Sequence, residues 1–200
     1  MNQTTTIMKA NSLILSCLIF FCSLANAQDT WKIDPVHSNV QFEVTHLVVS
    51  TVSGKFSEFS GSIVTAGDTF ENAQVSAEVD VQSIDTENLT RDKHLKEDDF
   101  FNAEKFPKIK FQGEHFKRIG GKEYLLSGDL TIRDVTKKVS MKATHSGTIS
   151  TGSKMISGFK VSFTINRFDY GLKWDDTLDS GSLVVGEDVD VKMNIELTKM

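Results

Sequence analysis

Residues 39–46 read Asn-Val-Gln-Phe-Glu-Val-Thr-His, and this stretch decides the fold class. Val40, Phe42 and Val44 alternate with polar residues, which is the period of a β-strand with one dry face and one wet face. The same alternation returns along the rest of the chain. It predicts seven more strands, over residues 56–64, 75–81, 109–118, 124–133, 139–149, 159–167 and 189–197. The sequence therefore predicts an all-β protein with eight strands.

The length and order of these strands favour a closed barrel over a sandwich. Several strands extend to about ten residues, whereas strands of globular proteins commonly have five or six. Long strands joined in sequence suit an antiparallel up-and-down barrel, whose closure removes the exposed edges of an open sheet. Eight strands enclose an interior that side chains can fill or that can hold one small ligand. We expect one such barrel domain, over residues 28–200.

Residues 1–27 have the features of an export signal. Lys9 supplies a positive charge, and residues 13–24 form an apolar run that is too short for an ordinary transmembrane helix. Ala25-Asn26-Ala27 then matches the small-x-small site of a signal peptidase. We expect cleavage after Ala27 and a secreted product. The alternative is an uncleaved membrane anchor.

Cleavage would change the composition in ways that bear on function. Both cysteines, Cys17 and Cys22, leave with the signal, so the product has no disulfide, cysteine nucleophile or cysteine metal ligand. Loss of Lys9 takes the formal net charge from -5 to -6. An acidic domain without a basic run is a poor candidate for nucleic-acid binding. No later apolar stretch has the length for stable membrane insertion of the mature protein.

The connections between strands predict two unequal ends of the barrel. In an antiparallel barrel, short turns fall at one end, at residues 66–72, 119–122 and 150–154. The longer connections fall at the other end, at residues 47–53, 83–106 and 168–186. Long loops in compact domains are usually functional or disordered. We therefore expect a ligand mouth at the end with the long loops.

The connection over residues 84–106 joins a charged segment to an aromatic cluster. Asp85 or Thr86 can cap a helix over residues 88–98, in which charges lie on most faces and Leu89 is the main apolar partner for Leu95. Three phenylalanines follow the helix. The sequence predicts a short helical lid with a charged outside and an aromatic underside. The alternative is a plug that completes the core.

Five segments of the chain match the pattern of a known family. They are IDPVHSNVQFEVTH (33–46), GKFSEFSGSI (54–63), RDKHLKEDDFFNAEKFPKIKF (91–111), GDLTIRDVTKKV (128–139) and INRFDYG (165–171). In this order and spacing they resemble the YceI-like polyisoprenoid-binding periplasmic proteins. The resemblance implies an elongated lipocalin-like barrel in the bacterial periplasm, often a homodimer. It also implies an apolar tunnel that holds an isoprenoid or a similar lipid chain.

Strand parity predicts which apolar side chains would line such a tunnel. Met and Phe suit a flexible chain because they fill irregular space without fixed polar partners. A filled barrel core uses the same residue types, so packing is the alternative for each residue. The predicted wall consists of Phe42, Val44, Val79, Phe111, Leu126, Leu130, Met141, Phe159, Phe163 and Met193, with Phe100, Phe101, Phe106 and Trp174 near the portal.

Two basic side chains are predicted to point inward near the mouth. His46 shares its face with Phe42 and Val44, and Arg167 follows a strand whose inward residues include Phe163. An inward arginine can hold a phosphate or another anionic headgroup through paired hydrogen bonds. The alternative is an ion pair of Arg167 with Asp169 or another carboxylate at the mouth.

The other histidines indicate structure and not chemistry. His115 and His145 share apolar faces toward the turn end, far from His46, so we expect hydrogen-bonded core histidines and no metal site. His37 beside Ser38 resembles a base beside a nucleophile, but adjacent strand residues point to opposite faces. We expect neither an enzyme nor a cofactor.

The predicted function is a secreted carrier or scavenger that binds a long apolar chain inside the barrel. The candidate ligands are a polyisoprenoid, an isoprenoid quinone or a fatty-acid-like lipid. Two alternatives are a ligand-free barrel with a structural or interaction role and, less favoured, a hydrolase.

Overall fold

The computed structural model describes residues 28–67 and 69–200. The predicted signal peptide, residues 1–27, lies outside the described residues, so its cleavage after Ala27 stays a prediction. The strands are β1 (Gln28–Ile33), β2 (Asn39–His46), β3 (Ser50–Phe56), β4 (Phe59–Ala66), β5 (Gln74–Asp80), β6 (Ile84–Asp85), β7 (Lys108–Gly120), β8 (Glu123–Ile132), β9 (Val135–Thr151), β10 (Lys154–Asn166) and β11 (Val185–Lys199). The described helices are α1 (Leu89–Leu95) and two 3-10 turns, η1 (Val81–Ser83) and η2 (Arg167–Tyr170).

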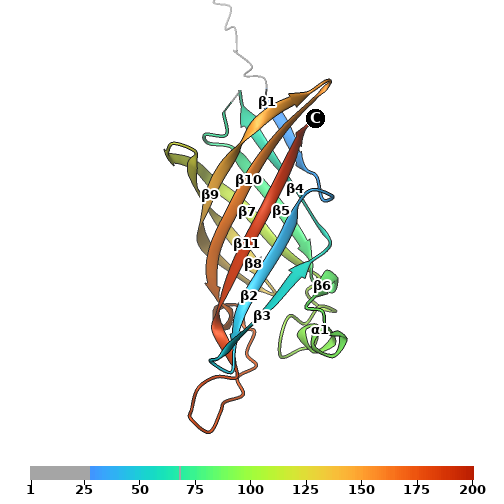
Figure 1. Cartoon of the computed structure of the whole chain (residues 1–200), viewed down its shortest axis with the longest axis vertical. Helices are drawn as coiled ribbons and strands as arrows, with labels where there is room; N and C mark the ends of the chain where they lie inside the picture. The colour runs from blue at the N-terminus through green and yellow to red at the C-terminus, as the bar shows by residue number, and fades with distance from the viewer. Residues whose placement is uncertain (1–27, 68) are drawn as a thin grey trace, which may run out of the picture.

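Eight strands close into an antiparallel barrel, which confirms the predicted fold class (Figure 1). The ring runs β1-β4-β5-β7-β8-β9-β10-β11, and β11 pairs with β1 to close it. Closure uses the last residues of β11, where Trp31 lies opposite Lys199 and Ile33 lies opposite Leu197. The rest of the same β11 edge pairs with β2, which continues into β3 and β6. One long strand therefore holds both N-terminal strands.

Side-chain alternation places the core inside the ring. Along β8, the side chains of Tyr124, Leu126, Leu130 and Ile132 are buried, and the residues between them are more exposed. The C-terminal strand contributes Leu197, which is fully buried. The period of two in the sequence thus becomes an apolar lumen.

The strand pattern of the sequence is wrong in the N-terminal third. The predicted mouth loop at 47–53 is mostly strand, because β3 begins at Ser50 after a tight turn. The predicted strand at 56–64 is broken between β3 and β4, and β1 has no counterpart among the predicted strands. These short strands are rich in Ser, Thr, Gly and charged residues, so they carry little alternation. Pairing with neighbouring strands, and not their own pattern, specifies them.

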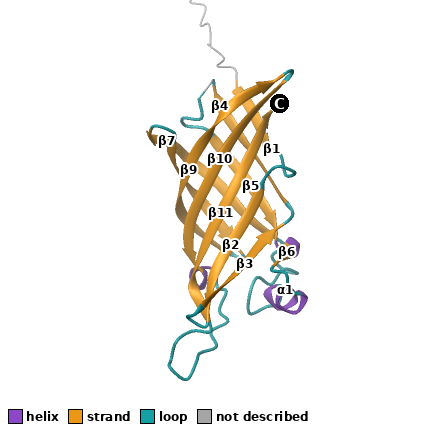
Figure 2. Ribbon diagram, in the orientation of Figure 1, coloured by secondary structure: helices purple, strands orange, loops and turns teal. Residues whose placement is uncertain are grey.

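The barrel has two unequal ends, as the connections predict (Figure 1; Figure 2). The turns that join β4 to β5, β7 to β8 and β9 to β10 lie at one end, together with the C-terminus. The segment containing α1 and the loop between η2 and β11 lie at the opposite end. We call the latter end the mouth.

The lid helix is shorter than predicted and begins at a different cap. The side chain of Asn88 accepts a hydrogen bond from Arg91 N, whereas Asp85 accepts one from Glu87 N outside the helix. The predicted contact of Leu89 with Leu95 is also wrong, because Leu89 is 89% exposed. Six positions along a helix bring two side chains to different faces. Leu95 instead packs against the barrel core.

A β-bulge in β7 reverses the predicted face of His115. The register of β7 on β8 shifts between Gly113 and His115, so His115 is exposed and Phe116 takes the buried position. The bulge lies where Gly113 faces Gly128. A Cβ on Gly128 would overlap the carbonyl oxygen of Gln112 and would come within 2.7 Å of the Cα of Gly113. The close backbone approach therefore requires glycine.

Replacement of Gly128 by alanine should destabilise the barrel by about 1 to 3 kcal/mol, the usual cost of overpacking a tight site. Urea unfolding of the two proteins measures the difference. Ser127→Ala is the matched control, because Ser127 is the neighbouring residue and its hydroxyl pairs with the Ser140 hydroxyl near the surface. A Gly128→Ala protein as stable as the control would show that the two strands can separate without cost.

His145 is hydrogen-bonded, as predicted, and its ring is half-buried against the core. Its ring stacks on Phe159 with centroids 4.8 Å apart, and its Nε2 lies 2.9 Å from Ser157 Oγ. Ser157 is fully buried. Partial burial of the imidazole removes water from it, and this desolvation lowers the pKa of His145 below its ordinary value of 6.5.

The lowered pKa predicts a loss of stability in mild acid. The unfolded chain binds a proton at His145 more readily than the folded chain, so the contribution is complete above pH 6.5 and decreases as the pH falls below it. Urea unfolding at pH 7.5 and 5.5 should show a smaller decrease in His145→Gln than in the unmodified protein. His115→Gln, at an exposed position, should keep the full decrease. Equal pH dependence in all three proteins would contradict the assignment.

Candidate functional site

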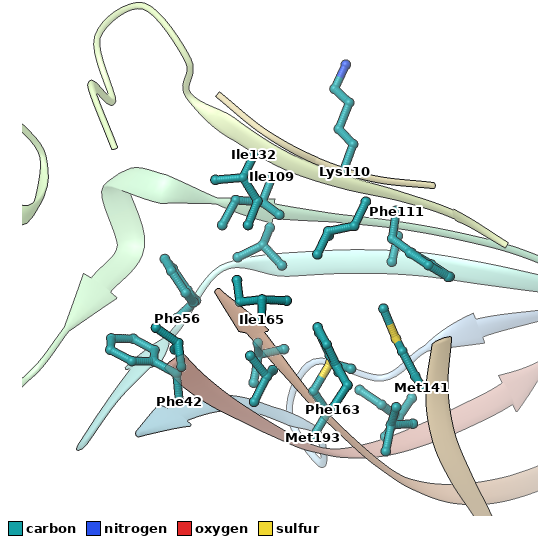
Figure 3. Close-up of a pocket in the computed structure, with 18 of the residues that line it drawn as sticks. Phe42, Phe56, Ile109, Lys110, Phe111, Ile132, Met141, Phe163, Ile165 and Met193 are labelled. Carbon is teal, nitrogen blue, oxygen red and sulfur yellow. The ribbon is translucent and has the colours of Figure 1, made fainter. Parts of the chain in front are cut away.

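The barrel encloses an apolar cavity of about 230 Å³. Side chains from all parts of the ring point into it, and Figure 3 shows Phe42, Phe163, Met193 and Met141 along its length. The stem of Lys110 touches the wall, but its amino group points away and lies 3.8 Å from Glu78 Oε1. The surface of the cavity is almost entirely apolar. Such a space suits a hydrocarbon chain and gives no fixed polar partner.

The predicted wall residues lie together around this cavity. All ten of them line it. Phe100 and Phe101 also line it, and they belong to the connection over residues 84–106, which we call the lid segment. Trp174 lies in a neighbouring pocket at the mouth. Phe106 lines neither space; its ring lies 5.6 Å from the guanidinium carbon of Arg133. The role of these residues in ligand binding stays a prediction.

A second pocket, of about 190 Å³, opens at the mouth beside the cavity. We call it the mouth pocket. It is lined by Phe42, Val44, His46, Val52, Thr86, Arg91, His94, Leu95, Phe100, Trp174, Val184 and Val185. Five of these residues also line the cavity, namely Phe42, Val44, Leu95, Phe100 and Val185. The two spaces therefore lie side by side and have apolar side chains in common.

Sequence reasoning placed His46 at the mouth but missed two basic residues beside it. Arg91 and His94 both lie on α1 and line the mouth pocket with His46. Their spacing of three residues is the available signal, because positions i and i+3 share one face of a helix. The sequence analysis expected charges on most faces of this helix, so it did not single out the face that carries Arg91 and His94.

Arg167 points inward at the end of β10, as expected, and it lines the cavity. It is 3% exposed, and its guanidinium donates to the carbonyl oxygens of Gly186, Leu172 and Val185 at 2.8, 2.8 and 2.9 Å. Burial lowers the pKa of Arg167, and the nearby carboxylates of Asp175 and Glu187 oppose that effect. The alternative pairing with Asp169 is not found, since Asp169 binds Lys137 at 2.8 Å. Arg167 thus joins the start of β11 to the loop that precedes it.

Comparison with known proteins identifies the family. The YceI-like domain matches residues 31–197. This chain belongs to the YceI-like family. UPF0312 protein SA2479 of Staphylococcus aureus strain N315 is 31% identical over 167 residues, which cover 82% of this chain and 95% of that protein.

Solved structures share the barrel of this YceI-like protein. The Campylobacter jejuni YceI protein has a TM-score of 0.65 and 28% identity, over 76% of this chain and 87% of that one. A polyisoprenoid binding domain from Saccharophagus degradans, implicated in plant cell wall breakdown, has a TM-score of 0.61 over 84% of this chain and 97% of its own. At 18% identity, the second likeness shows the fold alone.

The lid segment of this YceI-like protein is fastened to the rest of the mouth. Arg133 Nη1 donates to the carbonyl oxygens of Phe100 and Gly171, each at 2.8 Å. The carbonyl oxygen of Asp99 accepts hydrogen bonds from Lys173 N and Trp174 N. Phe100 is 6% exposed, and its ring stacks with that of Trp174 at 5.8 Å. These contacts join three connections across the opening.

His37 and Ser38 do not form a base and nucleophile pair in the described structure. His37 Nδ1 lies 2.9 Å from Asp34 Oδ2, whereas Ser38 Oγ accepts a hydrogen bond from Glu196 N at 2.9 Å. The hydrogen bond raises the pKa of His37 and lowers that of Asp34.

No helix among the described residues has the length and apolar character needed to cross a bilayer.

The adjacent phenylalanines of the lid segment should respond differently to truncation. Phe100 belongs to the buried core, so Phe100→Ala should cost about 3 to 5 kcal/mol of unfolding free energy. Phe101 is only partly buried and meets Phe56 edge-on at 6.0 Å, so Phe101→Ala should cost less. If the segment is a lid, Phe101→Ala should release a fluorescent fatty acid faster, as stopped-flow dilution measures. Unchanged release with a large loss of stability would make the segment a plug.

Proposed function

We propose that this protein is an exported carrier or scavenger that holds a long apolar lipid chain, such as a polyisoprenoid, inside its barrel. Its place of action is then the bacterial periplasm. The observation that carries the proposal is the apolar cavity, which shares five lining residues with a pocket at the mouth. The polyisoprenoid-binding neighbour supports the same ligand class for this fold.

The geometry suits capture of a chain through its apolar surface. Each methylene that enters the cavity contributes about 0.8 kcal/mol of transfer free energy. Measured ligand efficiencies of about 0.3 kcal/mol per atom limit a forty-atom lipid to about 12 kcal/mol, which corresponds to roughly nanomolar affinity. Tight binding therefore needs little help from polar contacts. Export would bring such a protein to membrane lipids and to the peptidoglycan space.

Recovery of the protein from its native host tests the proposal. Native mass spectrometry and solvent extraction should yield one long-chain lipid per chain, because a cavity with an apolar wall is costly to leave filled with water. Protein stripped of lipid should take up a prenyl chain or a fatty chain again. Phe163→Asp, which adds a charge to the cavity wall, should lose uptake, whereas Leu125→Asp on the outer face of β8 should keep it.

The rival functions predict other results. A structural or interaction barrel would emerge free of lipid and would refuse both kinds of chain. A hydrolase would turn over an ester and would lose that turnover when His37 or Ser38 is changed. The homodimer implied by the family resemblance stays a prediction, which sedimentation of the lipid-loaded protein can test.

A further inference from the structure

The mouth pocket has polar side chains, and an apolar lipid chain cannot form hydrogen bonds with them. Its polar wall consists of Thr86, His46, Arg91 and His94, and none of the residues that line it is a carboxylate. We infer that this pocket binds an oxyanion headgroup, a phosphate or a carboxylate, at the end of the lipid whose chain fills the cavity. This inference rests on the proposed carrier function and assigns a chemical class to its ligand.

Arg91 is held in position with one donor group left over. Its Nε donates to Thr86 Oγ1 at 2.8 Å, and its Nη2 donates to the Thr86 carbonyl oxygen at 2.6 Å. Its Nη1 has no hydrogen-bond partner among residues 28–67 and 69–200. Since a guanidinium stays charged at any physiological pH, the pocket contains a fixed positive charge on an oriented side chain. Preorganisation of this kind reduces the entropy lost on binding.

His46 lines the pocket from the strand opposite α1. It is the last residue of β2, where its backbone lies across from Ser50 on β3 and Val185 on β11. In the described part of the chain, its imidazole ring has no hydrogen-bond partner. A half-buried ring on a paired strand is well placed to donate a hydrogen bond to a ligand oxygen.

His94 completes the polar wall and is also oriented by its neighbours. Its Nε2 lies 2.9 Å from Asp99 Oδ2, and its ring meets the rings of Phe100 and Trp174 edge-on at 5.0 and 5.9 Å. The Nδ1 atom has no partner among the described residues. The carboxylate and the two aromatic rings fix the orientation of the imidazole, so Nδ1 is the ring nitrogen left to meet a ligand oxygen.

The carboxylates nearest to these groups are already engaged. Asp92 Oδ1 accepts hydrogen bonds from Thr86 N and Thr86 Oγ1, and Asp99 Oδ2 faces His94. The whole chain has a formal net charge of -5, so its overall field repels anions. Any affinity for an oxyanion must therefore come from a local cluster such as this one.

Arg167, which lines the cavity, is less suited to the same task. Three of its nitrogen atoms donate to backbone carbonyl oxygens, and a headgroup would have to compete with those bonds. The mouth pocket offers unpaired donors at the end of the cavity that faces the loops. We therefore place the headgroup at His46, Arg91 and His94.

The test compares lipids that share a chain and differ in their head. Geranylgeranyl phosphate is paired with geranylgeraniol, and palmitate is paired with hexadecanol. Affinity is measured by calorimetry on delipidated protein, and Trp174 in the pocket wall adds a fluorescence signal. At least one oxyanion should bind about tenfold more tightly than its alcohol, since a hydrogen bond to a charged group is worth about one decade or more. The pair with the larger ratio identifies phosphate or carboxylate as the preferred head.

Variants locate the preference in the pocket. His46→Phe should reduce the oxyanion-to-alcohol ratio by about tenfold, because a donor to the oxyanion is removed. His115→Phe, an exposed histidine outside the mouth, should change neither affinity. Arg91→Gln should also reduce the ratio, with thermal unfolding measured to confirm that the lid segment remains folded. Added salt should weaken oxyanion binding only.

The outcomes separate this inference from the function on which it rests. Equal affinity for alcohol and oxyanion in the unmodified protein, or an equal loss of both in His46→Phe, would overturn the headgroup site and leave the carrier intact. Failure of all four lipids to bind would overturn the carrier itself.

Discussion

The pairing of β11 with two N-terminal strands is the constraint on which the structure depends. The last residues of β11 pair with β1 and close the ring, and its preceding residues pair with β2, which ends at the mouth. A closed ladder satisfies the backbone groups that an open sheet would expose at its edges. Because the ladder satisfies those groups, the lumen needs no polar side chains. An apolar cavity can then exist inside a small domain, and the buried Arg167 in its lining is satisfied by hydrogen bonds to carbonyl oxygens.

The same closed ladder divides the molecule into an apolar cavity inside the barrel and a pocket with polar side chains at the mouth. Side-chain parity carries apolar residues inward along each strand until the strands end at the mouth. There, His46 marks the change from strand to turn, and α1 supplies polar groups from a connection that strand parity does not control. Arg133 and Arg167 use their guanidinium groups to fasten neighbouring loops. Arginine thus has a structural role at this end, whereas Arg91 lines the mouth pocket.

A strand or site can be predicted from the sequence when it depends on residues that are near one another in the chain. The long strands β7 to β11 come from alternation, which needs only neighbouring residues. β1 pairs with β4 and β11, which lie farther along the chain, and β3 pairs with the adjacent β2, but the residues of both strands show little alternation. The sequence misplaces His115 because a bulge adds one residue to the strand and reverses the face of every later side chain. The cavity wall came from parity and is well placed, whereas the mouth pocket required knowledge of how a helix faces a strand end far away in the sequence.

Both described ends of the domain lie at the end of the barrel opposite the mouth. Met200 N donates to the Thr30 carbonyl oxygen, which holds the C-terminus beside the first strand (Figure 1). A linker attached after Met200 would start about one barrel length from the lid. The protein can therefore be immobilised on a sensor surface or fused to another domain through its C-terminus, with the opening directed toward the solution.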